Sequence, residues 1–354
     1  MVFDVPADSG GVLSILHDFY EEVRSFADTS IEWYFVLGKP DLPETENIRV
    51  LRFPWVKKSW LHRLYFDYFV APGLIRKHSV ERVFSLQNII VPRTDVLQTV
   101  YIQQPLPFSE HSFSFLKSRL FWTYQNIIGK LIKHSILQAD KVIVQTEWMK
   151  KVVGRTGVPA SKVHVLPPRI PGVPKAYFKP SEQAFSTFFY PASPFLYKNH
   201  QLIIDACRIL KDQGYVNYRI FFTLDGSEDA HAARLLKKAR RNSLPIEFLG
   251  PLSREDVFSL YTDSVLLFPS YIETFGLPML EARLHKGFIL ASDCPFSHEI
   301  LDGYENVRFF DPFDAHALAS LMRDVMTGKA EYTSECSSLP ETTREMSMVE
   351  LLLQ

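Results

Sequence analysis

Hydrophobic and polar residues follow two different periods along the first half of the chain, and the two periods alternate. Short runs rich in β-branched and aromatic residues predict strands at 1–5, 32–38, 47–53, 83–87, 96–104, 141–146 and 163–168. Between these runs, apolar residues recur every three or four positions at 12–26 and 113–136, and a further helix is predicted to start after 146. Strands that alternate with helices are typical of parallel βαβ units.

The second half repeats this alternation after a proline-rich break. Residues 167–180 contain five prolines and follow neither period, so we interpret them as the connection between two domains. The predicted elements beyond it are strands at 186–193, 218–226, 246–250 and 265–270 and helices at 199–214, 229–242 and 253–264. The predicted fold class is α/β, with two doubly wound, Rossmann-like domains that face each other across a cleft. Ligands of such folds bind beyond the carboxyl ends of the strands.

These patterns divide the chain into four parts. The prediction assigns 1–168 to a first domain, 169–182 to the linker, 183–336 to a second domain and 337–354 to a tail. The tail carries an apolar stripe at helical spacing, formed by Met346, Val349, Leu352 and Leu353. It could cross back onto the first domain, form a peripheral helix or fray.

Composition narrows the class of protein. Hydrophobic residues make up 46% and charged residues 22% of the 354 residues, and the formal net charge of -1 argues against a nucleic-acid binder. The cysteines, Cys207, Cys294 and Cys336, have no paired or metal-ligand spacing, which predicts a reducing compartment. The first residues do not resemble a signal peptide, and no apolar run reaches the ~18 residues of a membrane span. We therefore expect a cytoplasmic location.

The stretch "FPSYIETFGLPMLEARLHKG" at 268–287 carries the most informative chemistry. It follows a predicted strand, and Pro278 suits the first turn of a helix. The free N–H groups of that turn would form a site for an anion or for sugar hydroxyls. Glu273 and Glu281 lie on either side of the turn, and carboxylates are good acceptors for paired hydroxyls. A nucleotide sugar has such hydroxyls at both ends and a diphosphate between them, although each glutamate alone could be an ordinary solvated residue.

At this stretch the sequence resembles a known family. "PSYIETFGLPMLEA" resembles the E-x7-E signature of the retaining, GT-B-fold glycosyltransferases of group 1 (family 4). The flanking segments "YPASPFLYKNHQLIIDA", "IEFLGPLSREDVFSLYTDSVLLFPS" and "ILASDCPFSHEIL" resemble its phosphate-binding loop and helix, the segment before the signature, and the strand and loop after it. The resemblance is specific over about 186–312 and looser over 1–168. It implies an acceptor-side first domain and a donor-binding second domain.

The resemblance also implies roles for individual residues. Glu281 would bind the ribose hydroxyls, Glu273 would contact the transferred sugar, and Lys198 would pair with the diphosphate. Further donor contacts would come from residues at two places: Thr274, Phe275, Gly276 and Leu277 at the helix start, and Gly10 and Gly11 in the "SGG" loop after the first strand. Glycines in that loop let backbone approach a ligand closely.

Two positions depart from the family pattern. Ser193 stands where the family commonly has an arginine, so one charge that would neutralise the diphosphate is missing. Gln103 stands where the family commonly has a histidine near the donor sugar. Glutamine can still donate and accept hydrogen bonds, but it cannot titrate.

The resemblance implies a transferase (EC 2.4) that moves a sugar from a nucleotide-diphosphate sugar to a glycan or polyprenyl-linked glycan. Surface polysaccharide assembly (capsule, exopolysaccharide or LPS) is the expected setting. The sequence has no D-x-D motif and no metal-ligand cluster, so neither a cofactor nor an obligatory metal is expected. The alternative is a non-catalytic nucleotide-sugar-binding or scaffolding member of the same fold. A nicotinamide dehydrogenase is disfavoured because no G-x-G-x-x-G turn follows a strand.

Aromatic and basic residues are mixed in two segments, Phe53–Phe69 and Phe113–Ser135. The first contains Trp60, Lys57 and Lys58, and the second repeats the combination. Basic residues beside exposed aromatic residues suit an anionic membrane surface, such as the inner face of a cell membrane. An aromatic-rich core with solvated basic faces would give the same composition.

Overall fold

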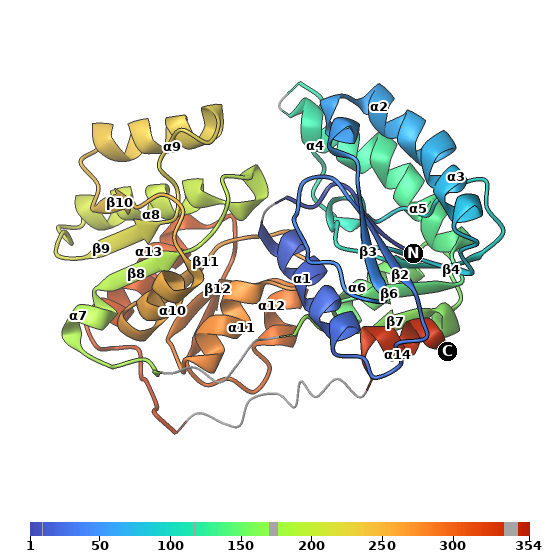
Figure 1. The fold of residues 1–354 in the computed structure, drawn as a ribbon. Coiled ribbons are helices and arrows are strands. Elements are labelled where there is room, and N and C mark those ends of the chain that lie inside the picture. Colours follow the sequence, from blue (N-terminus) through green and yellow to red (C-terminus); the bar gives the residue numbers. More distant parts are fainter. Residues whose placement is uncertain (9, 117, 170–175, 336–345) are drawn as a thin grey trace. The chain divides into compact units, whose positions relative to one another are not determined.

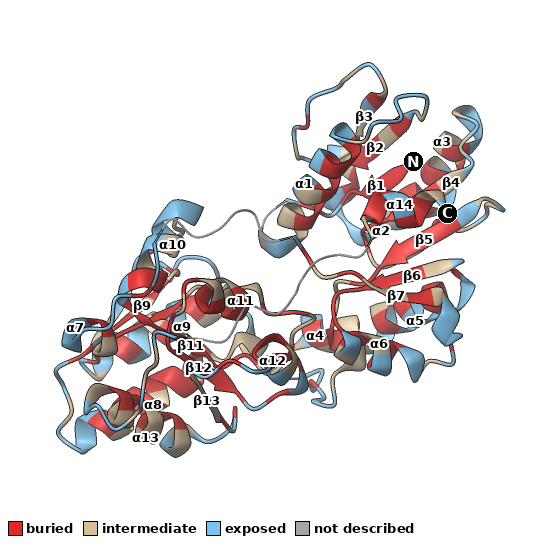
Figure 2. Ribbon diagram, turned by 90° about the horizontal axis from the view of Figure 1, so that it is seen from below, coloured by how far each residue is buried: buried red, intermediate tan, exposed pale blue. Residues whose placement is uncertain are grey.

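The computed structural model describes residues 1–8, 10–116, 118–169, 176–335 and 346–354. The chain forms two compact units. Unit 1 comprises Met1–Arg169 and Thr343–Gln354, and unit 2 comprises Ile170–Thr342. Each unit is built on its own twisted sheet, flanked by helices (Figure 1). Most residues of the central strands are buried, those of the edge strands β3 and β10 are less so, and the outer faces of the helices are exposed (Figure 2). The predicted α/β fold of two doubly wound, Rossmann-like units is confirmed.

The sheet of unit 1 has seven parallel strands in the order β3-β2-β1-β4-β5-β6-β7. Their bounds are β1 Val2–Asp4, β2 Trp33–Leu37, β3 Ile48–Arg52, β4 Arg82–Ser85, β5 Leu97–Tyr101, β6 Lys141–Val144 and β7 Val163–Val165. Successive residues of β1 serve opposite faces: Val2 joins the core beneath α1 (Gly10–Arg24), whereas Phe3 packs with Phe66 on the other side. Both faces are covered, which explains why these strands are apolar runs.

The other helical segments of unit 1 connect these strands. They are η1 Pro54–Lys58, α2 Trp60–Tyr65, η2 Phe66–Val70, α3 Ala71–Lys77, η3 Leu106–Phe108, α4 Arg119–Thr123, η4 Tyr124–Ile128, α5 Gly129–Gln138, α6 Glu147–Gly154 and η5 Ala160–Lys162. Of these, η2 and η4 are π-helical turns inside longer helices. The helix predicted at 113–136 therefore begins later than predicted. The Ser118 hydroxyl accepts the N–H of Phe121 and caps the helix there.

The sheet of unit 2 has six parallel strands in the order β10-β9-β8-β11-β12-β13. Their bounds are β8 Thr187–Tyr190, β9 Arg219–Phe222, β10 Ile246–Phe248, β11 Val265–Phe268, β12 Ile289–Ser292 and β13 Val307–Phe310. The helices are α7 Glu182–Phe185, η6 Leu196–Lys198, α8 His200–Asp212, α9 Ala230–Arg241, α10 Arg254–Asp263, α11 Leu277–Leu284, α12 Pro295–Ile300 and α13 Ala315–Met326. The segment expected to be a loop after β12 contains the short helix α12.

The proline-rich segment differs from a free linker where the structure describes it. Residues 170–175 lie outside the described residues, but Phe178 is buried and its N–H donates to the carbonyl of His285 at 2.7 Å. The N–H of Lys179 donates to the carbonyl of Thr262 at 2.9 Å. The predicted linker at 169–182 is therefore too long, because its second half is packed onto unit 2 and ends in α7.

The described part of the tail is a short helix, α14 (Met348–Leu353), that packs against α1 in unit 1. At the start of α14, the N–H of Val349 donates to the carboxylate of Glu22 at 2.8 Å. At its other end, Arg82 donates to the carbonyl of Leu352 at 2.5 Å and Lys141 to that of Leu351 at 2.6 Å. Both termini of α14 are thus hydrogen-bonded by unit 1 side chains, and the two cations complement the helix dipole.

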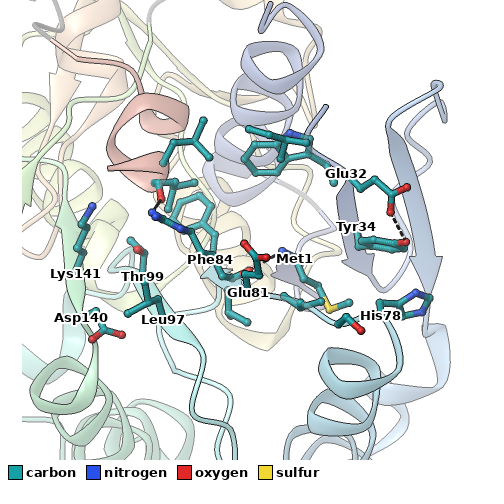
Figure 3. Close-up of a pocket in the computed structure, with 18 of the residues that line it drawn as sticks. Met1, Glu32, Tyr34, His78, Glu81, Phe84, Leu97, Thr99, Asp140 and Lys141 are labelled. Atoms are coloured by element: carbon teal, nitrogen blue, oxygen red, sulfur yellow. Dashed lines mark hydrogen bonds between the residues drawn. The ribbon is translucent and has the colours of Figure 1, made fainter. Parts of the chain in front are cut away.

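A cavity of about 600 Å³ lies beside α14 at the amino-terminal ends of the unit 1 strands (Figure 3). Met1, Glu32, Phe84 and Leu97 contribute to its lining. This is the edge of the sheet opposite the one at which doubly wound folds bind ligands. Within the part of the chain that the structure describes, no helix is long and apolar enough to cross a membrane.

Candidate functional site

The order of strands in unit 2 creates one favoured place for a ligand. β8 is the first strand of this sheet, β9 lies on one side of it and β11 on the other. The connections after β8 and β11 therefore leave in opposite directions, and a crevice opens between them at the carboxyl ends. The loop after β8 leads into α8, and the loop after β11 leads into α11.

Hydrogen bonds join these two loops. The carbonyl of Tyr197 accepts the N–H of Tyr271 at 3.1 Å and the hydroxyl of Ser270 at 3.2 Å. Asn199, which has a left-handed backbone with φ of 61°, donates its side-chain amide to the carbonyls of Pro269 (3.3 Å) and Pro312 (2.7 Å). The loops that line the crevice are therefore held in one geometry.

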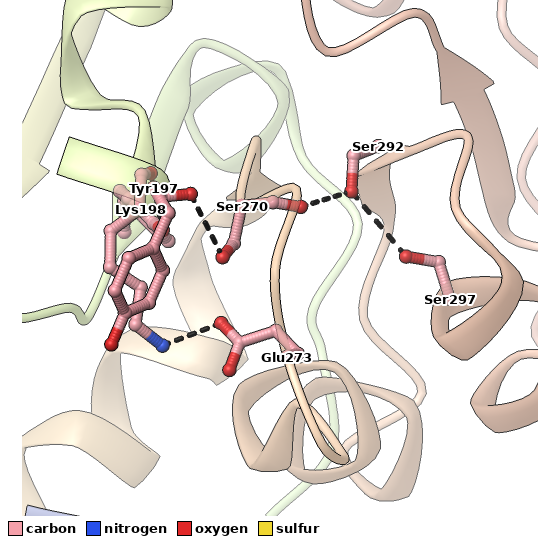
Figure 4. A network of polar contacts seen from close by, with 7 residues as sticks. Tyr197, Lys198, Ser270, Glu273, Ser292 and Ser297 are labelled. Carbon is pink, nitrogen blue, oxygen red and sulfur yellow. Dashed lines mark hydrogen bonds and ion pairs between the residues drawn. The ribbon is translucent and has the colours of Figure 1, made fainter. Parts of the chain in front are cut away.

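The neighbouring strand β12 also supports the loop after β11. The hydroxyl of Ser292, the last residue of β12, donates to the carbonyl of Ser270 at 2.5 Å. Ser292 also lies 3.5 Å from the hydroxyl of Ser297 in α12. Figure 4 shows this chain of contacts running from Tyr197 through Ser270 to Ser297. The bond from Ser292 supports the loop that carries Glu273 on the side away from Lys198.

Lys198 and Glu273 meet across the crevice. The Nζ of Lys198 donates to Oε1 of Glu273 at 2.5 Å, and the side chains are only 19% and 12% exposed (Figure 4). Lys198 is fixed at its backbone as well, because the buried hydroxyl of Tyr190 donates to its carbonyl at 2.7 Å. A partly buried ammonium and a carboxylate thus lie side by side at the switch point of the sheet. Together they offer one cation for an anion and one acceptor for hydroxyl groups.

The helix α11 begins beside this pair. Gly276 precedes it with φ of 93°, and Pro278 occupies its first turn, as predicted. A Cβ on Gly276 would lie 2.5 Å from Cε of Met279 and 3.3 Å from Cζ of Phe268. The left-handed backbone therefore favours glycine here, and a Cβ would also push aside the end of the Met279 side chain. The N–H groups at the start of a helix and its dipole favour an anion.

We expect Gly276→Ala to lower donor affinity more than it lowers stability. The left-handed backbone alone costs a residue with Cβ about 1–2 kcal/mol, and the Cβ would also meet the end of the Met279 side chain, which belongs to the first turn of α11. Gly328→Ala is the matched control, since Gly328 has φ of 69° but open space around its Cβ. The measurement is the melting temperature of both variants with and without nucleotide sugar. Equal donor-induced shifts in the two variants would contradict the role of Gly276.

Glu281 lies in the second turn of α11 and has two partners that the sequence did not single out. The hydroxyl of Tyr261 donates to its Oε2 at 3.1 Å, and a guanidinium nitrogen of Arg254 lies 3.7 Å from its Oε1. Burial raises the pKa of Glu281 above its ordinary value of 4.5, and the Tyr261 hydrogen bond and the Arg254 charge only partly oppose this. Arg254 itself is half-exposed at the start of α10, so its charge remains accessible to a ligand.

The remaining predicted site residues are divided between the two units. Phe275 is buried, whereas Ser193 is exposed on the loop after β8. Gly10 and Gly11 belong to unit 1 and form the first turn of α1, so the predicted "SGG" loop is wrong at these positions; Ser9 lies outside the described residues. Gln103 is also in unit 1, and its side-chain amide donates to the carbonyl of Leu86 at 2.9 Å. At least one donor of Gln103 therefore serves the fold.

Among the residues that the structure describes, no group of three or more His, Cys, Asp or Glu side chains is arranged to hold a metal ion. The cations that face the carboxylates of the site are those of Lys198 and Arg254.

The part of the chain that carries this site is similar to a known family. Residues 178–345 match the model of the family "Glycosyl transferases group 1". The O-antigen chain mannosyltransferase RfbU of Salmonella typhimurium is 20% identical over 262 residues, which are 73% of this chain and 69% of RfbU.

Solved structures show the same fold. Anabaena HepE in complex with UDP and glucose aligns with a TM-score of 0.67 at 17% identity, over 93% of this chain and 90% of HepE. WaaG, a glycosyltransferase involved in lipopolysaccharide biosynthesis, aligns with a TM-score of 0.69 at 17% identity, over 92% and 90%. The protein is therefore a glycosyltransferase of the GT-B fold, and residues 178–345, most of them in unit 2, are similar to the group 1 glycosyl transferases.

Proposed function

We propose that this protein transfers a sugar from a nucleotide-diphosphate sugar, with retention of the anomeric configuration, to a glycan or polyprenyl-linked glycan acceptor. The observation that carries the proposal is the Lys198–Glu273 pair at the switch point of unit 2, beside the start of α11. The resemblance to HepE, bound to UDP and glucose, supports the donor class. RfbU and WaaG support surface polysaccharide or lipopolysaccharide assembly as the setting.

The bond that breaks joins the anomeric carbon of the sugar to the β-phosphate oxygen of the nucleoside diphosphate. Negative charge then develops on the β-phosphate, and the ammonium of Lys198 and the N–H groups of the first turn of α11 stabilise it. When Lys198 turns to the phosphate, the carboxylate of Glu273 becomes available to hydroxyls of the transferred sugar. Glu281 accepts hydrogen bonds from the ribose hydroxyls.

The new bond forms on the same face of the sugar. The acceptor hydroxyl attacks the anomeric carbon as the diphosphate leaves, and its proton passes to a β-phosphate oxygen. This step needs no enzyme nucleophile and retains the configuration at the anomeric carbon. We propose that protein cations supply the positive charge without an obligatory metal. Arg254, 3.7 Å from Glu281, is a second cation near the donor and could offset the loss of the arginine at Ser193.

We further propose that the protein works at the cytoplasmic face of a membrane, where a lipid-linked acceptor is presented. Both segments proposed for this contact are partly exposed in unit 1, although Phe66, Phe113 and Phe121 are buried. No residue of α2 is buried, although its sequence is WLHRLY. Trp60, Leu61, Leu120 and Ile127 are each more than half exposed. An aromatic-rich core therefore does not account for these residues.

A donor screen tests the proposed reaction. The melting temperature is measured with UDP-, GDP- and dTDP-sugars in the presence of EDTA. A ligand at 100 times its dissociation constant stabilises the folded state by about 2.7 kcal/mol, so one base should give a shift of several degrees. Turnover of that donor, with NMR assignment of the product anomer, separates a retaining enzyme from an inverting one. Binding without turnover would instead identify a non-catalytic member, and a requirement for added metal would exclude the metal-independent reaction.

A further inference from the structure

The carboxyl group of Glu281, the proposed ribose ligand, lies in surroundings that disfavour its charge. The side chain is only 14% exposed, and burial raises the pKa of the carboxyl group. The neutral form that burial favours carries a proton on one oxygen and accepts fewer hydrogen bonds than the carboxylate. Binding of ribose hydroxyls by Glu281 therefore depends on neighbouring groups that keep the carboxylate ionised and hold it in one orientation.

Tyr261 contacts one oxygen of this carboxylate from the neighbouring helix α10. Its hydroxyl donates to Oε2 of Glu281 at 3.1 Å. The tyrosine is only 1% exposed, so water does not compete for this hydrogen bond. A donor to the charged form of a carboxyl group favours that form. Because the hydroxyl is uncharged, it orients the carboxylate without cancelling the negative charge that attracts the donors of a ligand.

The ring of Tyr261 is held on two sides. It packs edge-on against Phe189 of β8, with ring centres 5.6 Å apart, and against His285 at the end of α11, with ring centres 5.5 Å apart. The Nδ1 of His285 lies 2.7 Å from the backbone carbonyl oxygen of Glu281. The tyrosine is thus fixed both by the sheet and by the helix that carries Glu281. A side chain that is ordered in advance loses little conformational entropy when a ligand binds.

The other oxygen of Glu281, Oε1, faces the guanidinium of Arg254. The closest nitrogen is 3.7 Å away, which is beyond the range of a hydrogen bond. Arg254 also lies over the ring of Phe258, 5.1 Å from its centre. Against the effect of burial on the pKa of Glu281, the charge of Arg254 acts after the Tyr261 hydrogen bond in order of size. Among the residues that the structure describes, none donates a hydrogen bond to Oε1, so this oxygen is open to hydroxyl groups.

We propose that Tyr261 is a positioning residue for donor binding, whose hydroxyl fixes Oε2 of Glu281 so that Oε1 is presented to the ribose hydroxyls. Arg254 supplies charge from the half-exposed start of α10 and does not set the geometry of the carboxylate. Tyr261 acts through Glu281 and does not itself contact the substrate. The inference rests on the proposed donor class, because the ribose of a nucleotide sugar is the group that Glu281 binds.

Replacement of Tyr261 by phenylalanine tests this role, because it removes the hydroxyl and keeps the packed ring. We expect the dissociation constant of the donor to rise about tenfold, the loss typical of one hydrogen bond to a charged group. Turnover at saturating donor should stay near that of the parent protein, since the ribose lies away from the reacting carbon. Tyr218→Phe is the matched control and should change neither quantity. Tyr218 is also buried, and its hydroxyl donates to the carbonyl of Cys207 at 3.5 Å, near the amino-terminal end of β9.

The pH dependence of donor affinity separates positioning from a merely structural effect. The Tyr261 hydrogen bond opposes the effect of burial, so its loss should raise the pKa of Glu281 further. On acidification, donor affinity should therefore begin to fall at a higher pH in Tyr261→Phe than in the parent protein. Arg254→Gln should move the fall in the same direction by less. In about 1 M salt, where the Debye length is ~3 Å, the shift caused by Arg254→Gln should largely vanish and that of Tyr261→Phe should persist. His285, which contacts the carbonyl of Glu281, is common to all variants.

A measurement without donor keeps this inference separate from the transfer reaction. The NMR signal of the Glu281 carboxyl carbon, identified by its absence in Glu281→Gln, reports the pKa directly. An unchanged pKa in Tyr261→Phe would overturn the inference, and so would a raised pKa with unchanged donor affinity. The double variant Tyr261→Phe, Glu281→Gln should bind donor as Glu281→Gln does, and a further loss would show that Tyr261 acts by another route. If no nucleotide sugar binds the parent protein, the proposed reaction is wrong, and the carboxyl titration still decides whether Tyr261 controls Glu281.

Discussion

Replacement of Lys198 by alanine is expected to lower turnover about 10²–10³-fold, the loss typical of removing one preorganised group that stabilises charge in the transition state. Lys198 is held by Tyr190 and by the loop bonds of Tyr197, so its ammonium is positioned before the diphosphate arrives. Lys198→Arg keeps the charge but changes its geometry, and should retain part of the activity. Lys237→Ala, an exposed lysine of α9, should be neutral.

This prediction needs one further variant because Lys198 also neutralises Glu273. Alanine at 198 leaves a largely buried carboxylate without its cation and next to an incoming diphosphate. The double variant Lys198→Ala, Glu273→Gln removes that orphaned charge. If Lys198 stabilises the leaving group, the double variant stays slow, although its donor affinity partly recovers. Recovery of turnover to near the original rate would show that the ammonium only compensates for Glu273.

Replacement of Glu281 by glutamine is expected to weaken donor binding about 10-fold or more, because hydrogen bonds to a charged group contribute about 1.5–3 kcal/mol. Burial raises the pKa of Glu281, so the group takes up a proton at a higher pH than an ordinary glutamate. The ionised form is the better acceptor for ribose hydroxyls. Donor affinity should therefore fall as the pH drops from neutral to mildly acidic values, and calorimetric titration across that range measures it.

The glutamine variant carries the control for this pH dependence. Glu281→Gln cannot titrate, so its weaker donor affinity should stay nearly constant over the same range. Glu247→Gln removes an exposed carboxylate on β10 and should leave both the affinity and its pH dependence unchanged. An unchanged pH dependence in Glu281→Gln would mean that another group, on the protein or on the donor, is responsible.

Local patterns in the sequence were sufficient for most of the fold and for the start of α11. The apolar runs gave β8 and β11, and Pro278 marked the first turn of the helix, because these signals depend on neighbouring residues alone. The same signals failed at the beginnings of α1 and of the helix at Arg119. There the first turn is set by a cap or by glycines, and not by the apolar period.

The contacts of the site could not be predicted in the same way. Lys198 and Glu273 are 75 residues apart, and they meet because β8 and β11 are neighbours in the sheet. Strand order is a property of the whole unit, and a single strand carries no signal for it. Arg254 and Tyr261 were missed as partners of Glu281 for the same reason, since they reach it from a different helix. The family resemblance assigned Lys198 and Glu273 to the donor but did not reveal that they pair with each other.

The helix α14 has a consequence for the order in which the protein can mature on the ribosome. Its apolar residues Met348, Val349, Leu351 and Leu352 complete the core beneath α1, yet they follow all of unit 2 in the chain. Unit 1 is synthesised first but has to wait for unit 2 before this part of its core is covered. Unit 2 contains its own sheet as one continuous segment and can fold as it emerges. A nascent chain that stalls before α14 therefore presents an uncovered apolar surface to chaperones and proteases.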